Sequence, residues 1–585
     1  MGDLATRDSH EPVSPMLKAL VLDAFSSAGL ETIQSLGRRS VIIHASSPSN
    51  CQAFSSRYVA QRWEQPAGLP AGAFLEWLRQ LHTQHGYSLI VPSTEYSLFP
   101  LVELQLDDPL RARIQLPSRK SILAALDKWS TLELARSCDV PTPPSRLYDS
   151  QSDLSVPASF PVVLKATRSL IPTADRLQQM HPFLARDLSD WKQMLLSLLP
   201  LTPVIEQTHL AGHGVGIELL YRNGEMIWHF CHERLHEGSG RGGLGSGSSY
   251  RRSLPTPPNL LADATKLLNL LRWHGVAMVE FLVTPDGRHY LMEINPRLWG
   301  SLALAIDAGV DFPWGLFLMA TGQPVPAQPD YRVPYFTRAL AQDTRWILEC
   351  LLSRPMMGLW NIMGFARVFS GREGWDHFDW GDLGVTATGA RESLRGAVAS
   401  VANRLRKGLD LRRAKRIHRK NLTRLRSRQQ GCRQIVFLCQ GNICRSPVAE
   451  QIARRELPGQ RVSSAGFHQE SGRPSPLHLQ QAARSLGFDL SALRSSTVSP
   501  RMVEEADLII LMDGRNLLDF SQQFPRDLEK VLLLGMFLSP PSEIRDPYDA
   551  NLQQTINILQ QIERGIQEFA KELGLVDHQK QRCPQ

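Results

Sequence analysis

The sequence predicts an α/β protein of several domains, and three observations support this prediction. The chain has 585 residues, enough for three or four domains at about 100 to 200 residues each. Short apolar runs alternate with helical patterns, which is typical of parallel strands joined by helices. Near the C-terminus, a glycine-containing loop lies between a strand pattern and a helix pattern, as in many α/β phosphate sites.

The composition is that of an ordinary folded protein. Hydrophobic residues make up 42% of the chain and charged residues 21%, which excludes a disordered, fibrous or collagen-like protein. The 8 cysteines include no paired CxxC arms, so we predict neither a disulfide framework nor a structural zinc site and expect a cytoplasmic location. No apolar stretch reaches the ~18 residues that a membrane span needs, so we expect a soluble protein.

The N-terminal part has the pattern of a parallel sheet. Apolar runs at 19–22, 41–43 and 88–91 are separated by a helical pattern at 28–36 and by polar connections. No GxGxxG motif follows the first run, so the pattern does not predict a dinucleotide site. We expect a Rossmann-like domain here, after a disordered segment at residues 1–16.

A predicted hairpin in the middle of the chain carries a candidate metal site. With a four-residue turn, Val283 would pair with Arg288 and Glu280 with Leu291. Glu280 and Glu293 would then share a face on a diagonal of about 7 to 8 Å.

Asn295 would lie on the same face as Glu280 and Glu293. Two carboxylates on an otherwise apolar face are costly to bury unless cations neutralise them, and oxygen ligands suit Mg²⁺. The alternative is an exposed hairpin face whose acids bind nothing.

This hairpin, together with Met292–Arg297, resembles the metal site of the ATP-grasp superfamily, and the likeness extends back to about Lys18. The segments Asp127–Lys128 and Val163–Lys165 are similar to the start of that fold and to its phosphate-binding strand. The resemblance implies ATP and Mg²⁺, or Mn²⁺, as cofactors. It implies that the metal ligands are Glu280, Glu293 and Asn295, that Lys128 and Lys165 neutralise phosphates, that Glu206 and Gln207 lie at the adenine hinge, and that Arg297 holds the transferred phosphoryl group or the acyl phosphate.

Two loops depart from the ATP-grasp pattern. The loop after Lys165 lacks the usual glycines and reads ATRSLIP over residues 166–172. Six glycines instead fall in residues 238–247. This glycine-rich segment is either a mobile lid over the phosphates or a flexible hairpin tip.

The positive charge of the chain is concentrated in one segment. The formal net charge is +8, and residues 404–433 contain 13 Lys or Arg and one acid. The segment has no aromatic residue, whereas nucleic-acid-binding surfaces usually combine basic and aromatic side chains. We therefore expect a solvated helical linker and no nucleic acid, with docking to an anionic membrane or partner as the alternative.

A phosphate-binding loop is the strongest motif of the chain. Residues 439–447 read CQGNICRSP, after the apolar run 435–438 and before a helical pattern at 448–456. Backbone N–H groups of such a loop, the helix N-terminus and the guanidinium of Arg445 converge on one dianion. The same positive surroundings favour the thiolate form of Cys439 and make it a nucleophile.

The region from Arg433 to Gly574 resembles the low-molecular-weight protein tyrosine phosphatases. Besides the loop, the tripeptide beginning at Asp546 and the segments 463–466 and 506–513 are similar to that family. The resemblance implies hydrolysis of a phosphotyrosine protein or a small phosphomonoester through a cysteinyl phosphate. In that reaction Cys439 attacks phosphorus, Arg445 binds the equatorial oxygens, and Asp546 protonates the leaving group and then activates water.

The same resemblance assigns supporting roles in the loop. Asn442 would stiffen it, and Ser446 would hydrogen-bond the thiolate. Cys444 is either a partner for a reversible disulfide with Cys439 or simply a small loop residue. The chain departs from the family at residues 492–496, which read ALRSS where a His and an Arg usually buttress the loop.

Together, the two resemblances imply an enzyme with two catalytic parts. One half would use ATP to activate a carboxylate and join it to an amine, and the other would hydrolyse phosphotyrosine. The alternative is a phosphatase regulated by a nucleotide-sensing module that ligates nothing. The expected parts are a disordered N-terminus at 1–16, a Rossmann-like α/β domain at 17–120, an ATP-grasp domain at 121–325, a Trp-containing extension of unknown role at 326–403, a basic linker at 404–432, a phosphatase domain with a central parallel sheet at 433–578 and a tail at 579–585.

Overall fold

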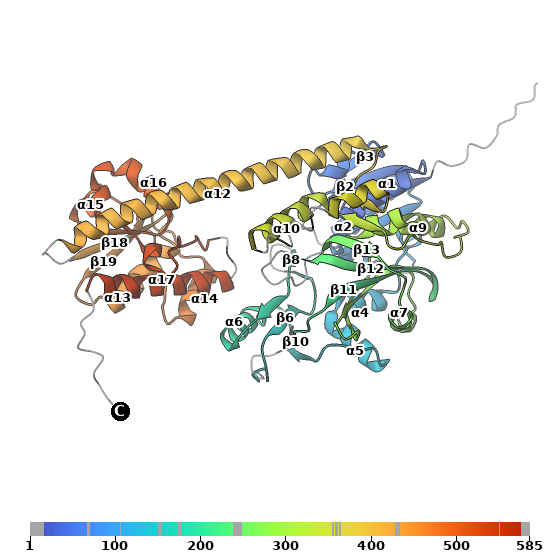
Figure 1. Ribbon diagram of the computed structural model, residues 1–585, viewed down its shortest axis with the longest axis horizontal. Helices are drawn as coiled ribbons and strands as arrows, with labels where there is room; N and C mark the ends of the chain where they lie inside the picture. Colours follow the sequence, from blue (N-terminus) through green and yellow to red (C-terminus); the bar gives the residue numbers. More distant parts are fainter. Residues whose placement is uncertain are drawn as a thin grey trace, which may run out of the picture. The chain divides into compact units, whose positions relative to one another are not determined.

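The computed structural model describes most of the chain and divides into two compact units, Met1–Leu394 and Arg395–Gln585 (Figure 1). The described residues are 17–66, 71–105, 107–149, 155–172, 177–237, 248–353, 356, 361, 364–427, 433–548, 550 and 552–574. The predicted glycine-rich lid, the predicted disordered N-terminus and the predicted tail lie outside these residues.

The first unit begins with the predicted parallel sheet, in the strand order β3-β2-β1-β4. Four of the five residues of the inner strand β1 and all residues of the edge strand β4 are buried, because core side chains cover both faces of these strands. The strands are β1 (Lys18–Leu22), β2 (Ile42–Ser47), β3 (Val59–Glu64) and β4 (Leu89–Pro92), and the helices are α1 (Ser27–Gly37), α2 (Ala71–His85) and α3 (Glu95–Leu101), with short 3₁₀ turns at Gln52–Ser55 and Pro109–Arg113.

A small antiparallel sheet follows, in the order β5-β10-β6-β9. One face packs on α6 (Leu188–Leu198) around the buried Trp191. The side chain of Lys165 lies on the other face of the sheet, together with that of Gln207. The strands are β5 (Ser145–Tyr148), β6 (Val162–Ala166), β9 (Phe183–Ala185) and β10 (Val204–Thr208); a separate ribbon is formed by β7 (Leu170–Pro172) and β8 (Leu177–Gln179), and the helices α4 (Arg119–Leu126) and α5 (Lys128–Ser137) precede the sheet.

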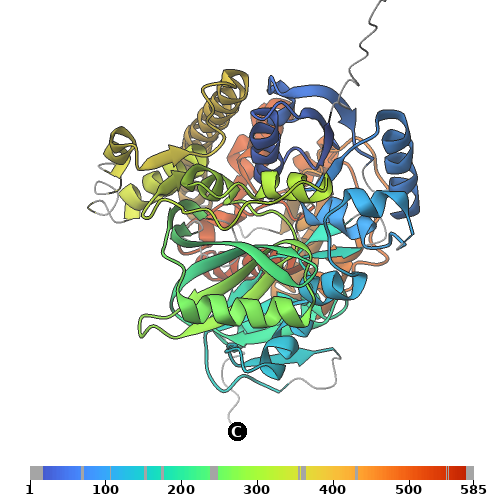
Figure 2. The same cartoon turned by 90° about the vertical axis from the view of Figure 1, so that its right-hand side faces the viewer.

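A seven-stranded sheet in the order β15-β14-β11-β12-β13-β16-β17 forms the rest of the first unit. The helix α7 (Pro258–Leu270) covers one face (Figure 2), and α8 (Leu302–Ala308), α9 (Phe312–Ala320) and the N-terminal sheet share a core with the other. The strands are β11 (His213–Arg222), β12 (Glu225–Glu237), β13 (Ser248–Ser253), β14 (Gly275–Val283), β15 (His289–Asn295), β16 (Phe336–Arg338) and β17 (Glu373–Trp375).

The sheet continues beyond residue 325, where the ATP-grasp domain was expected to end. Both β16 and β17 come from the Trp-containing extension. Arg338 is 1% exposed and pairs with Glu373 at 2.9 Å and with Asp343 of α10 (Leu340–Ser353). Buried, mutually neutralised charges of this kind fix the extension to the sheet, so the expected boundary lies inside the structural unit. A 3₁₀ turn at Gly364–Ser370 precedes β17.

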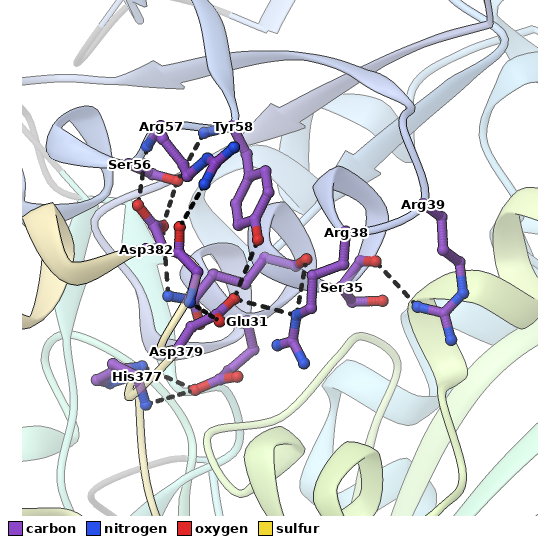
Figure 3. Close-up of polar contacts among 12 residues, drawn as sticks. Glu31, Ser35, Arg38, Arg39, Ser56, Arg57, Tyr58, His377, Asp379 and Asp382 are labelled. Atoms are coloured by element: carbon purple, nitrogen blue, oxygen red, sulfur yellow. Dashed lines mark hydrogen bonds and ion pairs between the residues drawn. The ribbon is translucent and has the colours of Figure 1, made fainter.

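The segment that follows β17 is fastened to the N-terminal sheet (Figure 3). The carboxylate of Asp382 accepts hydrogen bonds from Oγ of Ser56 at 2.5 Å and from the N–H of Arg57 at 2.8 Å. Glu31 of α1 accepts from the N–H of His377 at 2.8 Å, and Nδ1 of that imidazole lies 2.9 Å from the same oxygen. Part of the predicted extension therefore joins the two ends of the first unit.

The long helix α12 (Leu383–Arg426) contains most of the predicted basic linker. Its last turns belong to the core of the second unit: Ala414 and His418 are buried, and Nδ2 of Asn421 donates to the carbonyls of Leu528 and Val531 at 2.7 and 2.8 Å. These residues recur every three or four positions between the cations, which gives the helix one packed face and one charged face. This part of the segment is structural and is not only a solvated linker.

The second unit contains the predicted central parallel sheet, in the order β19-β18-β20-β21. The helices α13, α14 and α17 pack on one face, and α15, α16 and α12 on the other. The strands are β18 (Gln434–Cys439), β19 (Arg461–Gly466), β20 (Leu508–Leu511) and β21 (Val531–Leu533); the helices are α13 (Arg445–Glu456), α14 (Leu477–Ser485), α15 (Pro500–Glu505), α16 (Gly514–Gln523) and α17 (Leu552–Glu572), with 3₁₀ turns at Pro525–Lys530 and Leu534–Phe537.

Among the described helices, none is by itself long and apolar enough to cross a membrane. Only α8 and α9 taken as a pair pass that test, and they meet at a bend of 86°.

Candidate active sites

The phosphate-binding loop begins where β18 ends. Cys439 is the last residue of β18, and Arg445 is the first residue of α13. Sγ of Cys439 is buried, lies 3.0 Å from Oγ of Ser446 and accepts from the N–H of Asn442 at 3.3 Å. A hydroxyl and a main-chain N–H aimed at the sulfur stabilise a thiolate.

Asn442 holds the loop in shape. Its φ of +50° lies in the left-handed region, which Asn tolerates better than most residues. Nδ2 donates to Oγ of Ser446 at 3.0 Å and to Oγ of Ser464 at 2.9 Å, and Oδ1 accepts from the N–H of Ser496 at 2.7 Å. Segment 492–496, which departs from the family pattern, thus supports the loop through the main-chain N–H of Ser496.

The guanidinium of Arg445 is held by two carboxylates. Nη1 contacts Asp513 and donates to the carbonyl of Ile544 at 2.9 Å, and Nη2 donates to Oδ2 of Asp546 at 2.7 Å. Nε is buried and has no hydrogen-bond partner among the described residues. The plane of the guanidinium is therefore fixed, with the Nε–H and the second Nη2–H left to donate to phosphate oxygens.

The two carboxylates on Arg445 differ in accessibility. The side chain of Asp546 is 45% exposed and that of Asp513 is 17% exposed, so Asp546 is better placed to exchange a proton with a substrate. The sequence pattern assigned no role to Asp513. Asp513 lies just after the end of β20, which is the parallel neighbour of β18. Because the ends of neighbouring parallel strands lie close together, this position could have identified Asp513 as a site residue.

Cys444 is a buried free thiol, and so is Cys439. Burial raises the pKa of Cys444, and the nearby carboxylate of Asp546 raises it further. A thiol that stays protonated is a weak nucleophile, which favours Cys444 as a small loop residue in the reduced protein. The reversible disulfide remains a prediction.

The hairpin of β14 and β15 exists, but its predicted register is wrong. Val283 pairs with His289 rather than with Arg288. The turn is one residue longer than expected, because the N–H of Thr284 donates to the carbonyl of Arg288 at 2.9 Å and the N–H of Gly287 donates to the carbonyl of Thr284 at 2.9 Å.

A β-bulge then brings the two acids of the hairpin closer than expected. The pairing shifts between Glu280 and Phe281, so Glu280 lies directly opposite Glu293, and not opposite Leu291. Nδ2 of Asn295 donates to Glu280 at 3.2 Å and to Glu293 at 3.1 Å. The structure therefore gathers the three predicted metal ligands into one cluster.

Cations from two other elements balance this cluster. Nη2 of Arg234 on β12 donates to Glu280 at 2.5 Å, and Nζ of Lys128 lies 3.5 Å from Glu293. Burial raises the pKa of Glu280, although Arg234 opposes this shift. Burial also opposes ionisation of Glu293, but the charge of Lys128 and the hydrogen bond from Asn295 outweigh it and hold the pKa of Glu293 below its usual range.

Lys165 faces the same region from the small sheet. Its Nζ donates to Oε1 of Gln207 at 3.0 Å, and burial, reinforced by the charge of Lys128, lowers the pKa of Lys165 to about 8. The side chain of Glu206 points to the other face of β10, where it accepts from Nε1 of Trp191 at 2.6 Å. Gln207 thus joins Lys165, whereas only the main chain of Glu206 is available at the predicted hinge.

Arg297 links the hairpin to the N-terminal sheet. Its Nη2 lies 3.4 Å from Oε1 of Glu95, the first residue of α3, and its Nε is buried without a hydrogen-bond partner among the described residues. Sequence patterns assigned a role to neither Glu95 nor Arg234. Glu95 could have been predicted as a site residue, because it follows the carboxyl end of the parallel strand β4. Arg234 can be recognised only once the order of β14, β11 and β12 in the sheet is known.

The donor set of this cluster fits a magnesium nucleotide. Carboxylate and amide oxygens are ligands that Mg²⁺ prefers, and Mg²⁺ commonly shares them with nucleotide phosphates. Glu280, Glu293 and Asn295 supply such oxygens, and Lys128 and Lys165 supply positive charge for the phosphates.

Comparisons with known proteins match both units. Residues 434–580 match the family model for low molecular weight phosphotyrosine protein phosphatase, and residues 202–339 match the model for ATP-grasp in the biosynthetic pathway with Ter operon. The low molecular weight protein-tyrosine-phosphatase Etp of Escherichia coli is 32% identical over 140 residues, which are 24% of this chain and 94% of that protein. The probable phosphatase EpsP of Ralstonia nicotianae is 35% identical over 132 residues, 23% of this chain and 90% of that protein.

Among solved structures, N5-carboxyaminoimidazole synthetase from Staphylococcus aureus is similar to 58% of this chain and 86% of its own, at 18% identity and a TM-score of 0.45. The family match at residues 202–339 identifies an ATP-grasp module in the first unit. Through residues 434–580, with Cys439, Arg445 and Asp546 gathered in one loop site, the chain belongs to the low-molecular-weight protein-tyrosine-phosphatase family.

Proposed function

We propose that the chain is a bifunctional cytoplasmic enzyme, in which a protein tyrosine phosphatase is joined to an ATP-grasp ligase that works through an acyl phosphate. The observation that carries the ligase half is the cluster of Glu280, Glu293 and Asn295, which is contacted by cations from two other elements, Arg234 of β12 and Lys128 of α5. A purely structural hairpin has no need of opposed carboxylates at the meeting point of so many charged groups.

The phosphatase half uses its loop as a nucleophile and an anion cradle. The thiolate of Cys439 attacks phosphorus while Arg445 binds the equatorial oxygens, and the carboxyl of Asp546 gives its proton to the departing phenolate. Asp546 then takes a proton from water, and the resulting hydroxide releases phosphate from the sulfur. Oγ of Ser446, 3.0 Å from Sγ, stabilises the thiolate before attack and after release.

In the ligase half, the residues of the hairpin and the small sheet would hold the nucleotide. Glu280, Glu293 and Asn295 would bind the magnesium ion, and Lys128 and Lys165 would bind phosphate oxygens. Bound magnesium and ATP supply an electrophilic phosphoryl group for a substrate carboxylate. The guanidinium of Arg297, whose side chain is 23% exposed, would hold the resulting acyl phosphate for capture by an amine.

The test is ADP formation by the Cys439→Ser full-length chain, given Mg-ATP and fractions of a cytosolic metabolite pool. The serine variant prevents the phosphatase from removing phosphate from products. We expect ADP only with certain fractions, and trapping with hydroxylamine should yield a hydroxamate from the acyl phosphate. The matched control is Glu293→Gln, which should abolish ADP formation because it removes one metal ligand.

A nucleotide sensor is the second candidate for the first unit, and the departure of the loop at 166–172 from the usual glycine-rich pattern favours it. ATP binding without turnover in any fraction would support the sensor and contradict the ligase. A change of phosphatase rate on nucleotide addition would then identify what the sensor regulates.

The charged face of α12 supports a further proposal, contact with an anionic membrane. Six cations on its last turns are exposed and form no ion pair among the described residues: Arg412, Arg413, Lys415, Arg416, Arg419 and Lys420. We expect salt-sensitive sedimentation with anionic vesicles, lost when these six become Gln. Sedimentation that survives the substitutions would contradict this contact.

A further inference from the structure

A cavity of about 650 Å³ lies beside the phosphatase loop. Two lining residues connect it to the catalytic site: Ile443 belongs to the loop, and Tyr548 follows Asp546 by two residues and donates its N–H to that carboxylate at 3.2 Å. The lining residues are Ile443, Arg473, Pro474, Ser475, Pro476, Leu477, Gln480, Ser491, Arg494 and Tyr548.

The lining carries two arginines and no acid. Nη2 of Arg473 donates to the carbonyl of Gly441 at 2.9 Å, and Nη1 of Arg494 donates to the carbonyls of Ser491 and Leu493 at 2.9 and 2.8 Å. These acceptors are neutral, so they orient the guanidinium groups without cancelling their charge. Among the described residues, neither arginine forms an ion pair, whereas Arg445 next to them is held by two carboxylates.

The cavity also exposes apolar surface. The side chain of Leu477 is 77% exposed and that of Tyr548 is 57% exposed. Apolar walls combined with fixed guanidinium groups suit a peptide segment that carries an anionic side chain, rather than an inorganic ion alone.

We propose that this cavity is an anion subsite that selects phosphotyrosine flanked by a second acidic group. The group would lie within one or two residues of the phosphotyrosine and would be either a carboxylate or a second phosphate. Arg494 is its specificity-determining residue, and Arg473 couples the subsite to the loop through Gly441. This inference rests on the phosphatase activity of the second unit.

The test compares three phosphotyrosine peptides on the full-length chain. One has neutral flanks, one has Glu beside the phosphotyrosine, and one has a second phosphotyrosine there. We expect kcat/KM to be about fivefold higher for an acidic peptide, mainly through a lower KM, since an exposed charge pair has an effect of about this size. The Glu and diphosphorylated peptides show which anion is preferred, and the preference should shrink at high salt.

Variants identify the residue responsible. Arg494→Gln should bring the ratio of acidic to neutral peptide close to one, and Arg494→Lys should keep part of it. The matched control is Arg501→Gln, a change at a residue 86% exposed whose partner is Glu505. Hydrolysis of p-nitrophenyl phosphate by each variant corrects for differences in the folded fraction.

Two outcomes would overturn the proposal: an unmodified chain with no preference for acidic peptides, or a preference that persists unchanged in Arg494→Gln. Hydrolysis of the neutral peptide by the unmodified chain tests the phosphatase activity itself. A failure of that activity is thus distinguished from a failure of the subsite.

Discussion

The two proposed phosphate sites of this chain are built in opposite ways. In the second unit, Cys439, Asn442, Arg445 and Ser446 come from one loop and the first turn of its helix, and a cation is held by two acids. In the first unit, two acids are held by cations that come from other elements, Lys128 of α5 and Arg234 of β12. The comparison indicates that the loop site, which is contiguous in sequence, can bind an anion directly. The hairpin site, which is formed by residues far apart in sequence, presents carboxylates and must bind a cation before it can bind a phosphate.

Metal removal gives the largest expected contrast between the two sites. Treatment with EDTA should abolish ADP formation, because Glu280 and Glu293 repel phosphates unless a cation lies between them. Hydrolysis of p-nitrophenyl phosphate should be unchanged in the same sample, since Cys439 and Arg445 need no metal. Added Mg²⁺ should restore the first activity alone. Equal loss of both activities would contradict the proposal that only the first unit needs a metal ion.

Substitution of the two carboxylates on Arg445 sharpens the description of the loop site. Asp546→Asn should lower kcat by about 10²- to 10³-fold, because it removes the proton donor. The loss should be largest with phenyl phosphate, whose leaving group needs the proton most. Asp513→Asn is the matched control and should cost less, with no dependence on the leaving group. The reverse pattern would make Asp513 the acid.

The strain at Asn442 gives a smaller effect. Asn442→Ala removes three hydrogen bonds and places a residue with a Cβ at φ +50°, so we expect about a tenfold loss of kcat/KM and a lower Tm of the second unit. Asn442→Gly keeps the backbone freedom but not the bonds. It should recover most of the Tm and little of the activity. Full recovery of activity in the glycine variant would show that only the backbone conformation matters.

The smallest expected effect is a pH dependence in the first unit. Burial raises the pKa of Asp307 to about 7, and the nearby Glu31 and Asp376 contribute. The folded state therefore binds a proton more tightly than the unfolded state, and stability falls as pH rises from about 4 through 7. Asp307→Asn should raise the Tm of this unit by a few degrees at pH 8 and by less at pH 5.

The exposed Asp149→Asn is the control for this titration and should leave the pH profile unchanged. A profile that is equally steep in Asp307→Asn would assign the pH dependence to another group. His377 is one such group, because its contact with Glu31 raises the pKa of His377 despite burial, and that contribution is also lost as pH rises.

Sequence patterns predicted the loop site more completely than the hairpin site, for a physical reason. Cys439, Asn442, Arg445 and Ser446 are neighbours along the chain, so one motif contains their spacing. The parallel sheets were likewise predictable, because buried parallel strands form uninterrupted apolar runs.

The hairpin shows what a pattern cannot supply. Glu280 and Glu293 were predicted to share a face, but the bulge after Glu280 that sets them directly opposite each other depends on local backbone geometry. Arg234 reaches Glu280 across β11, which lies between their two strands, and that neighbourhood exists only in the folded sheet. The strands β16 and β17, which continue the sheet beyond residue 325, were not predicted for a similar reason, since both are too short to stand out in the sequence.

The contacts of α12 and β17 have a practical consequence for dividing the gene into expressible pieces. A fragment ending at residue 339, where the ATP-grasp match stops, would lack Asp376, which pairs with the buried Arg251 at 2.8 Å. A phosphatase fragment starting at residue 433 would uncover the core surface that Ala414 and His418 now cover. A first fragment that ends at residue 394 and a second fragment that starts shortly before residue 412 should therefore stay soluble. Fragments that end at residue 339 or start at residue 433 should aggregate.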